Sequence, residues 1–235
     1  MTIVKRQRLR LAGIVALVCA GAVFAADATM LGLPVSGAEA AAADYRTLLR
    51  LPEWRLRVGG YGAFLIFGLL AGAWQLYEGI KPAGAWWSLP PFLLISYFFA
   101  GGAVFHYLLA FAIAAGKTQA EAQGVGGEVT EALAQTARSY LLVPFYASVA
   151  SLVTGSVWFA AAVLLRPTQF PRWMALLSPA LPIGAAYLIT RSLPAPVGGY
   201  LFPPSIHLAT PIIFGASTAL LWNVGRDSSN EASRK

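Results

Sequence analysis

Long apolar runs separated by short polar segments extend along the whole chain. Six runs approach the roughly 20 residues that a helix needs to cross a hydrocarbon core about 30 Å thick. They cover residues 9–33, 58–77, 89–115, 140–165, 174–189 and 206–224. These runs are continuous, whereas the strands of a membrane β-barrel alternate apolar and polar residues. We therefore predict an all-α polytopic membrane bundle of about six transmembrane helices, forming one transmembrane domain over residues 1–235.

The segments between the runs predict how the helices are connected. Residues 40–57 combine leucine and aromatic side chains with four arginines, which is typical of a segment at the membrane interface. Residues 117–138 form the most polar stretch, so we expect a loop outside the membrane that contains a surface helix. Residues 79–84 predict a tight turn between two runs. Prolines inside the last three runs predict helices that are kinked or locally unwound.

Two interpretations of the first run remain open. Residues 11–23 have the length of a signal-peptide core, and Val23-Phe24-Ala25 resembles a small-residue cleavage site. Cleavage there would remove residues 1–25 and leave five spans. Apolar residues continue after Asp27, however, and further runs follow, which favours an uncleaved first helix.

The charge pattern supports a membrane protein. Charged residues make up 11% of the chain, against roughly 25% in soluble domains. The net charge of +7 comes from basic residues at the ends of the runs, where they meet lipid headgroups, so nucleic acid is not an expected partner. Ten of the 17 Lys and Arg residues fall on the side of the membrane that holds both termini. This bias predicts that both termini are cytoplasmic.

Short matches in the same order connect the two halves of the chain. Pro52-Glu53-Trp54 corresponds to Pro171-Arg172-Trp173, Pro82-x-Gly84-x-Trp86 to Pro196-x-Gly198-x-Tyr200, and Pro90-Pro91 to Pro203-Pro204. A repeat unit of three helices would insert its second copy upside down, as in many transporters. Two three-helix inverted repeats are therefore one interpretation, and chance recurrence of residues common at membrane boundaries is the other.

Ionisable side chains within the apolar runs are the candidate site residues, because each is costly to place inside a bilayer. They are Asp27, His106, Arg191 and His207. His106 follows Gly101-Gly102, a pair that leaves room beside it. With cytoplasmic termini, all four side chains fall in the outer half of the membrane, so we predict that they form an outward-facing polar cluster. The alternative is that they are hydrogen-bonded or interfacial residues without a direct role.

The spacing of ligand-type residues predicts no metal site and no cofactor. Cys19 is the single cysteine, the two histidines are not one helical turn apart, and no Gly-rich phosphate loop follows a strand. A haem held by both histidines is a further option, although we expect them at different depths in the membrane. Glu78, near the end of the second run, is interpreted as a solvated helix end.

One stretch of the chain resembles an uncharacterised family of small bacterial multi-pass membrane proteins, filed only as a domain of unknown function. The stretch runs from Trp74-Gln75-Leu76-Tyr77 through Lys81-Pro82-Ala83-Gly84 and Leu89-Pro90-Pro91-Phe92 to Gly101-Gly102-Ala103-Val104-Phe105-His106. The resemblance implies a six-helix membrane domain and draws attention to His106, and an acidic residue at the end of the first span corresponds to Asp27. It implies no reaction. We accordingly expect a multi-pass protein of the bacterial inner membrane.

Three functional hypotheses follow. The leading one is that the protein binds or transports a small or lipid-like molecule, with membrane lipids and a small-molecule ligand as its partners. The second is an intramembrane enzyme acting on a lipid or isoprenoid, with His106 as acid or base and Asp27 orienting it. The third is a non-catalytic subunit of a membrane complex, in which the small face Gly68-x-x-x-Gly72 packs on another subunit.

Overall fold

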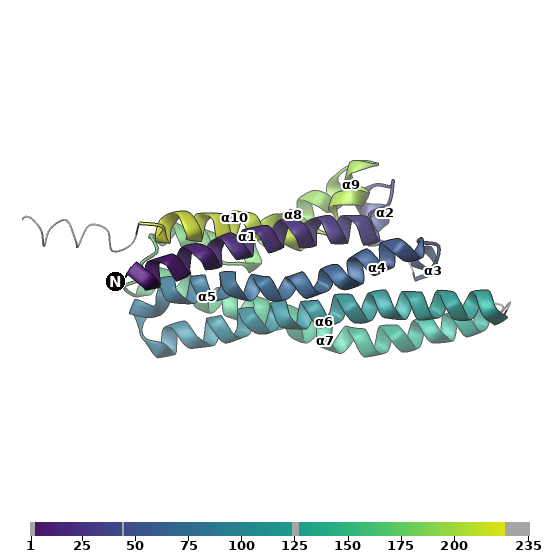
Figure 1. The fold of residues 1–235 in the computed structure, drawn as a ribbon, viewed down its shortest axis with the longest axis horizontal. Coiled ribbons are helices and arrows are strands. Elements are labelled where there is room, and N and C mark those ends of the chain that lie inside the picture. The colour runs from purple at the N-terminus through teal and green to yellow at the C-terminus, as the bar shows by residue number, and fades with distance from the viewer. Residues whose placement is uncertain (1–2, 44, 124–126, 224–235) are drawn as a thin grey trace, which may run out of the picture.

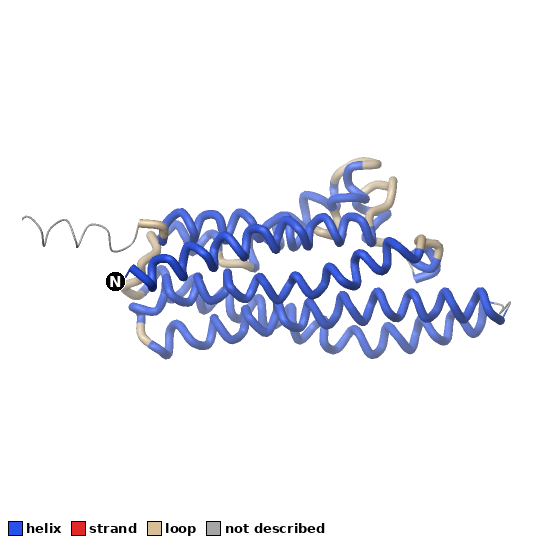
Figure 2. Tube along the Cα trace, viewed as in Figure 1, coloured by secondary structure: helices blue, strands red, loops and turns tan. Residues whose placement is uncertain are grey.

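The protein is a bundle of helices that lie side by side along one long axis (Figure 1). The computed structural model describes residues 3–43, 45–123 and 127–223. Figure 2 shows helices joined by short turns and loops, with no strand in this part of the chain. This architecture confirms the prediction of an all-α bundle.

The helices follow the order of the predicted runs. The first half contains α1 (Ile3–Leu31), α2 (Gly37–Ala41), α3 (Tyr45–Leu49), α4 (Glu53–Gly62), the 3₁₀ helix η1 (Ala63–Gly68), α5 (Leu69–Ile80), the 3₁₀ helix η2 (Lys81–Ala83) and α6 (Ala85–Gln123). The second half contains α7 (Gly127–Leu165), the 3₁₀ helix η3 (Arg172–Leu177), α8 (Ala180–Ser192), α9 (Val197–Leu201) and α10 (Ser205–Leu221).

Four helical segments are long and apolar enough to cross a membrane: Val4–Leu31, Glu53–Ala83, Ala85–Lys117 and Ser139–Leu165. They correspond to the first four predicted runs, and they make this chain an integral membrane protein. The last predicted run is the shorter apolar helix α10, with 17 residues. The fifth run is divided into η3 and α8 at Ser178-Pro179, where proline lacks the backbone N–H that a continuous helix needs. A count of six crossings depends on these two shorter segments.

Successive long segments alternate in direction, so both ends of the described chain lie at one end of the bundle (Figure 1). There the guanidinium of Arg10 on α1 donates hydrogen bonds of 2.8 and 3.1 Å to the carbonyl oxygen of Trp222, just after α10. The same guanidinium stacks 4.5 Å from the centre of the Trp222 ring. These contacts hold the beginning of α1 beside the end of α10.

The structure differs from the predicted loop over residues 117–138. Both α6 and α7 continue through most of this segment, while residues 124–126 lie outside the described part of the chain. The segment is rich in Ala, Gln and Glu, which are strong helix formers, and the two helices pack on each other. The result is a helical hairpin that extends beyond the other helices at one end of the bundle (Figure 1). Its place outside the membrane stays a prediction.

The second span contains a 3₁₀ turn, η1, that the sequence analysis missed. Glycines around it pass close to α1: a Cβ atom at Gly62 would lie 2.3 Å from Cβ of Ala26, and one at Gly68 would lie 2.3 Å from Sγ of Cys19. A Cβ atom at Gly72 would lie 2.5 Å from the Phe214 ring on α10. The predicted small-residue face is therefore confirmed, but its partners belong to the same chain. This removes the observation on which the complex-subunit hypothesis rested.

Loops and short helices close the bundle at the end where α1 finishes. The amide of Leu33 donates to the carbonyl of Gly199 on α9 (3.1 Å), and the amide of Gly199 donates to the carbonyl of Val35 (2.8 Å). The guanidinium of Arg55, on α4, donates to the carbonyl oxygens of Thr29 and Gly32. These contacts fix the last turn of α1. The interfacial position of residues 40–57 and the inverted repeat stay predictions.

Candidate functional site: an Asp–His–His cluster beside an apolar cavity

Asp27 lies on the buried face of α1. Buried positions on this helix recur every three or four residues: Leu9, Ala12, Ala16, Ala20, Val23, Asp27 and Met30. Because an α-helix turns once in 3.6 residues, these positions share one face. The Asp27 residue is only 2% exposed. An acidic side chain thus occupies a position that the rest of the helix reserves for small or apolar side chains.

The two histidines lie on the inward faces of their helices in the same way. On α10, His207 belongs to a buried series with Thr210, Phe214, Ser217 and Leu221. On α6, His106 lies between buried positions of a similar series, namely Ile95, Phe99, Ala103, Ala110 and Ile113. The spacing of both series is again three or four residues, which directs these faces into the bundle. His207 is 3% exposed.

The three side chains meet at one point, with the carboxylate between the imidazoles. Nδ1 of His106 lies 3.3 Å from Oδ1 of Asp27, and Nε2 of His207 lies 3.2 Å from Oδ2 of Asp27. The ring centres of the histidines are 6.0 Å apart. The expectation that the histidines lie at different depths is therefore wrong. A haem does not fit between them, because both rings are directed at the carboxylate.

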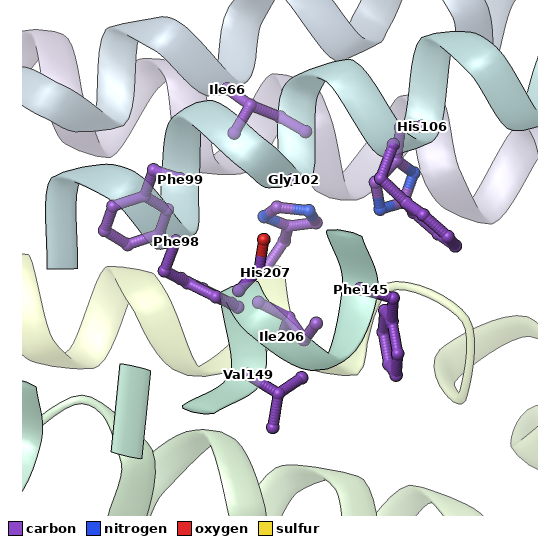
Figure 3. A pocket seen from close by; sticks show the side chains of 11 residues that line it. Ile66, Phe98, Phe99, Gly102, His106, Phe145, Val149, Ile206 and His207 are labelled. Carbon is purple, nitrogen blue, oxygen red and sulfur yellow. The ribbon is translucent and has the colours of Figure 1, made fainter. Parts of the chain in front are cut away.

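A cavity of about 50 Å³ lies beside the histidines. Its apolar wall comes from η1, α6, α7 and α10 and contains Ile66, Phe98, Phe99, Phe105, Phe145 and Ile206. Figure 3 shows the imidazoles of His106 and His207 at this cavity, with phenylalanine side chains around them. The site therefore combines an apolar space with one small group of ionisable side chains, as ligand sites in proteins commonly do.

The glycine pair before His106 has two separate roles. A Cβ atom at Gly102, which lines the cavity, would meet no atom within 4 Å. A Cβ atom at Gly101 would lie 2.4 Å from Oγ of Ser148, so this glycine lets α7 approach α6. The predicted room beside His106 is thus present at Gly102, and it opens into the cavity.

Arg191, the fourth predicted member of the cluster, does not join the other three. It follows Thr190, which is 1% exposed and marks the buried face of α8. The next residue on a helix is turned by about 100°, which directs Arg191 away from the bundle, and its side chain is exposed. The predicted group of four is therefore reduced to three residues in the structure.

Sequence reasoning missed the donor geometry of the cluster. One ligand-type atom from each of Asp27, His106 and His207 lies within 4.8 Å of the others, an arrangement that could hold a metal ion. No metal site was predicted from the sequence, because His106 and His207 are not one helical turn apart. Here the donors come from three different helices. One sequence feature indicates this arrangement. Each of the three residues is spaced three or four positions from other buried residues of its helix, which places it on the inward face.

A family comparison covers nearly the whole chain. The DUF6796 family, described as a family of unknown function, matches residues 1–222. The chain belongs to this family. The match bears out the resemblance to an uncharacterised family, although the family description does not specify a membrane or a bacterial source. Comparison with the curated proteins and with the solved structures finds no match.

The matched region of DUF6796 includes all three members of the Asp–His–His cluster. Chemically, the cluster offers one carboxylate and two imidazoles, which can donate and accept hydrogen bonds, exchange protons, or bind a cation. Oδ2 of Asp27 and Nδ1 of His106 take part in the contacts within the cluster, at 3.2 and 3.3 Å. Nδ1 of His207 is buried and has no hydrogen-bond partner among the described residues, and buried polar atoms are normally hydrogen-bonded, so this atom indicates unused binding capacity.

Proposed function

We propose that this protein binds a small amphiphilic molecule from the bilayer. The polar end of the molecule reaches Asp27, His106 and His207, and its apolar body lies against the phenylalanine-rich wall. The observation that carries this proposal is the position of an Asp–His–His cluster, in which Asp27 and His207 are buried and His106 is partly buried, at the edge of an apolar cavity inside a membrane protein. Ionisable groups are costly at this depth and usually serve a function when they occur there.

The size of the cavity defines which part of the ligand enters it. Pockets that enclose a whole drug-sized molecule have volumes of roughly 300–1,000 Å³. The cavity here has a volume of about 50 Å³, which accommodates an end group but not a whole lipid. Phe145 on its wall is 37% exposed, so the cavity lies near the lateral surface of the bundle. The remainder of the ligand therefore extends past Phe145 among the acyl chains.

The Gly102→Leu variant tests this proposal, because Gly102 lines the cavity, a Cβ atom there meets no atom within 4 Å, and the larger side chain would occupy cavity space. The matched control is Gly21→Leu, at an exposed helical glycine on α1 that also has no atom near its Cβ position. Purified protein is extracted with organic solvent, and the co-purifying amphiphiles are quantified by mass spectrometry. We expect a species that is retained by wild type and Gly21→Leu and reduced about tenfold or more by Gly102→Leu. Equal amphiphile content in all three proteins would refute the proposal.

A second candidate function is catalysis on the bound lipid or isoprenoid. It is favoured by the 3.3 Å separation between Nδ1 of His106 and Oδ1 of Asp27, in which a carboxylate orients an imidazole that borders the cavity. Such a pair acts as general acid or base in many enzymes. A comparison of cellular lipids with wild type and His106→Gln expressed at equal levels tests it. A substrate that accumulates with the variant supports catalysis, while identical lipid profiles exclude it.

We place the protein in the inner membrane of a bacterium, with both termini in the cytoplasm. The bias of Lys and Arg residues toward the side of the termini supports this orientation, as do the four basic residues before the first span. Its partners are then the surrounding lipids and the amphiphilic ligand. The cluster lies toward the outer half of the membrane in this orientation, because α1 approaches its far end at Asp27 and α10 begins near His207.

A further inference from the structure

We propose that Asp27, His106 and His207 form a binding site for one divalent transition-metal ion, with zinc as the reference ion. The donor set of two imidazole nitrogens and one carboxylate is one that zinc and iron sites in proteins use. The site would be assembled from three helices, α1, α6 and α10. This inference shares its residues with the proposed function, but metal binding itself does not depend on the nature of the amphiphile.

The distances within the cluster suit a common ion. Zinc binds histidine nitrogen and carboxylate oxygen at about 2.0–2.2 Å, so two ligands of a tetrahedral ion lie about 3.4 Å apart. The contacts of Asp27 with His106 and His207 measure 3.3 and 3.2 Å. One donor atom from each residue lies within 4.8 Å of the other two. Side-chain rotations of modest size therefore bring all three donors onto one ion.

The unsatisfied atoms of the cluster are the second observation. Oδ2 of Asp27 and Nδ1 of His106 are buried, and neither has a hydrogen-bond partner among the described residues. Each of these atoms nevertheless faces another member of the cluster at ion-pair distance. Donor atoms from three helices that converge in this way are what a ligand set for a metal ion presents.

Charge balance gives the same preference. A carboxylate that is 2% exposed inside an apolar bundle needs a nearby positive charge. The cluster can obtain it in two ways, from a divalent ion or from a proton on one imidazole. Each neutral imidazole already carries one N–H that can donate to the carboxylate, so an added proton would charge one histidine and leave both contacts in place. A divalent ion supplies the positive charge and engages both histidines at once.

Three protein ligands leave at least one coordination position open, which is how catalytic and ligand-binding zinc sites differ from closed structural ones. His106 and His207 both line the cavity, so the open position faces the space where the proposed amphiphile places its polar end. The ion would therefore receive an oxygen atom of that polar end. A carboxylate, phosphate or hydroxyl group fits this role, and a purely hydrocarbon ligand does not.

Metal analysis of the full chain, purified in mild detergent without chelators, tests the inference. After incubation with Zn²⁺ and removal of free ion, we expect about one zinc per wild-type chain and less than about one tenth per chain for Asp27→Ala, His106→Ala and His207→Ala. Ser148→Ala is the matched control, since this hydroxyl lines the cavity without belonging to the donor set, and it keeps the ion. Co²⁺-loaded wild type should show ligand-field absorption bands that the Asp27→Ala variant lacks.

The zinc and Co²⁺ measurements on the wild-type protein test the metal site even if the alanine variants do not fold. The metal site is overturned if wild type binds no zinc and shows no Co²⁺ absorption bands. It is also overturned if the three substitutions leave the zinc content unchanged. The proposed function fails separately. If wild type binds no zinc but Gly102→Leu still lowers the amphiphile content, only the metal site is overturned. If wild type binds zinc but Gly102→Leu leaves the amphiphile content unchanged, only the amphiphile site is overturned.

Discussion

Among the described residues, buried ionisable and amide side chains gather at two levels along the bundle. One level holds the Asp–His–His cluster, and the other holds Gln75 and Glu78 near the beginning of α1. Lys5 and Asp27 are separated by about 33 Å along α1 at 1.5 Å per residue. Apolar positions such as Ala16 and Ala20 lie between them on the buried face. The two levels therefore have different roles, and only the Asp–His–His level borders the apolar cavity described above.

Glu78 corrects the interpretation of a solvated helix end. It is 4% exposed and forms ion pairs with Lys5 on α1 (2.6 Å) and Lys81 (3.0 Å). The sequence showed Lys81 one turn away, but only the packing of α1 brings Lys5 to the carboxylate and covers it. Glu78 therefore joins the beginning of α1 to the end of α5.

We predict that Glu78→Gln destabilises the protein by about 1–3 kcal/mol, because it removes a buried charge while two lysines remain. Its control is Glu53→Gln, which breaks the pair of Glu53 with Arg57. Both side chains of that pair are more than 60% exposed, so we expect a change within about 0.5 kcal/mol. Thermal unfolding in detergent measures both variants. Equal effects of the two substitutions would contradict the distinction between buried and exposed pairs.

Gln75 supplies a second test at this level. Its amide nitrogen donates to the carbonyl of Leu9 (3.0 Å), and its amide oxygen accepts from Ser217 (2.7 Å) and Thr218 (3.1 Å). One side chain thus connects α1, α5 and α10. We predict that Gln75→Leu lowers stability by about 0.5–2 kcal/mol, the range for hydrogen bonds between membrane helices.

The comparison for Gln75→Leu is Ser151→Ala. The hydroxyl of Ser151 donates only within its own helix, to the carbonyl of Ala147 (2.8 Å), so its loss should leave the melting temperature nearly unchanged. Urea or thermal unfolding of both variants in the same detergent decides the matter. A larger loss for Ser151→Ala than for Gln75→Leu would show that the connection between the three helices is not stabilising.

Three of the four cluster residues could be found from the sequence because ionisable residues are rare in the apolar runs. Arg191 could not be excluded in this way. The run that contains α8 is apolar on all sides, so its composition does not reveal which face is buried. Neighbouring helix positions point in different directions, so Thr190 is buried while Arg191 is exposed and lies outside the cluster. Likewise, sequence separation hides that His106 and His207 are neighbours in space.

At the scale of elements, close contact between α1 and the α4–η1 segment positions Asp27. Gly62 lies against Ala26, the residue before Asp27, and Gly68 lies against Cys19. Glycine on one helix and small residues on the other allow the backbones to approach, as in other membrane helix pairs. The 3₁₀ turn η1 lies within this closely packed segment. No proline marks it, so the apolar pattern alone predicted a regular helix over residues 58–77.

We predict that Gly62→Ala destabilises the protein by about 1–3 kcal/mol, because the new methyl group would lie 2.3 Å from Cβ of Ala26 and one helix must move. The movement displaces Asp27, so amphiphile and metal content should fall as well. Gly21→Ala, at an open position on α1, is expected to be neutral or to stabilise by up to about 1 kcal/mol. Thermal unfolding and ligand content measure the two effects. A stable Gly62→Ala variant with unchanged ligand content would refute the role of this contact.

At the scale of the whole molecule, alternating segments explain how distant residues form one site. The chain passes along the bundle in alternating directions, which returns α10 beside α1 after more than 170 residues. Asp27 near the end of α1 and His207 in the first turn of α10 therefore reach the same level. The number and direction of apolar runs predict this alternation. They do not predict which helices are neighbours, because lipid and protein interiors are equally apolar and leave the same pattern in the sequence.

The same alternation places the end of the α6–α7 hairpin opposite the end of the bundle that holds the beginning of α1 and the end of α10 (Figure 1). Helix α6 has 39 residues and a length of about 58 Å, well beyond a hydrocarbon core of about 30 Å. The end of α6, at Gln123, lies at the opposite end of the bundle from the end of α10, at Leu221, and Asn223 follows two residues later (Figure 1). We therefore predict that Gln123→Cys, in a Cys19→Ala background, reacts with a membrane-impermeant maleimide at the outer surface of intact spheroplasts. Asn223→Cys in the same background should react only after the membrane is opened, because the proposed orientation places that end in the cytoplasm. Labelling of both positions from one side would refute the alternating arrangement, and a reversed pattern would keep the arrangement but invert its orientation.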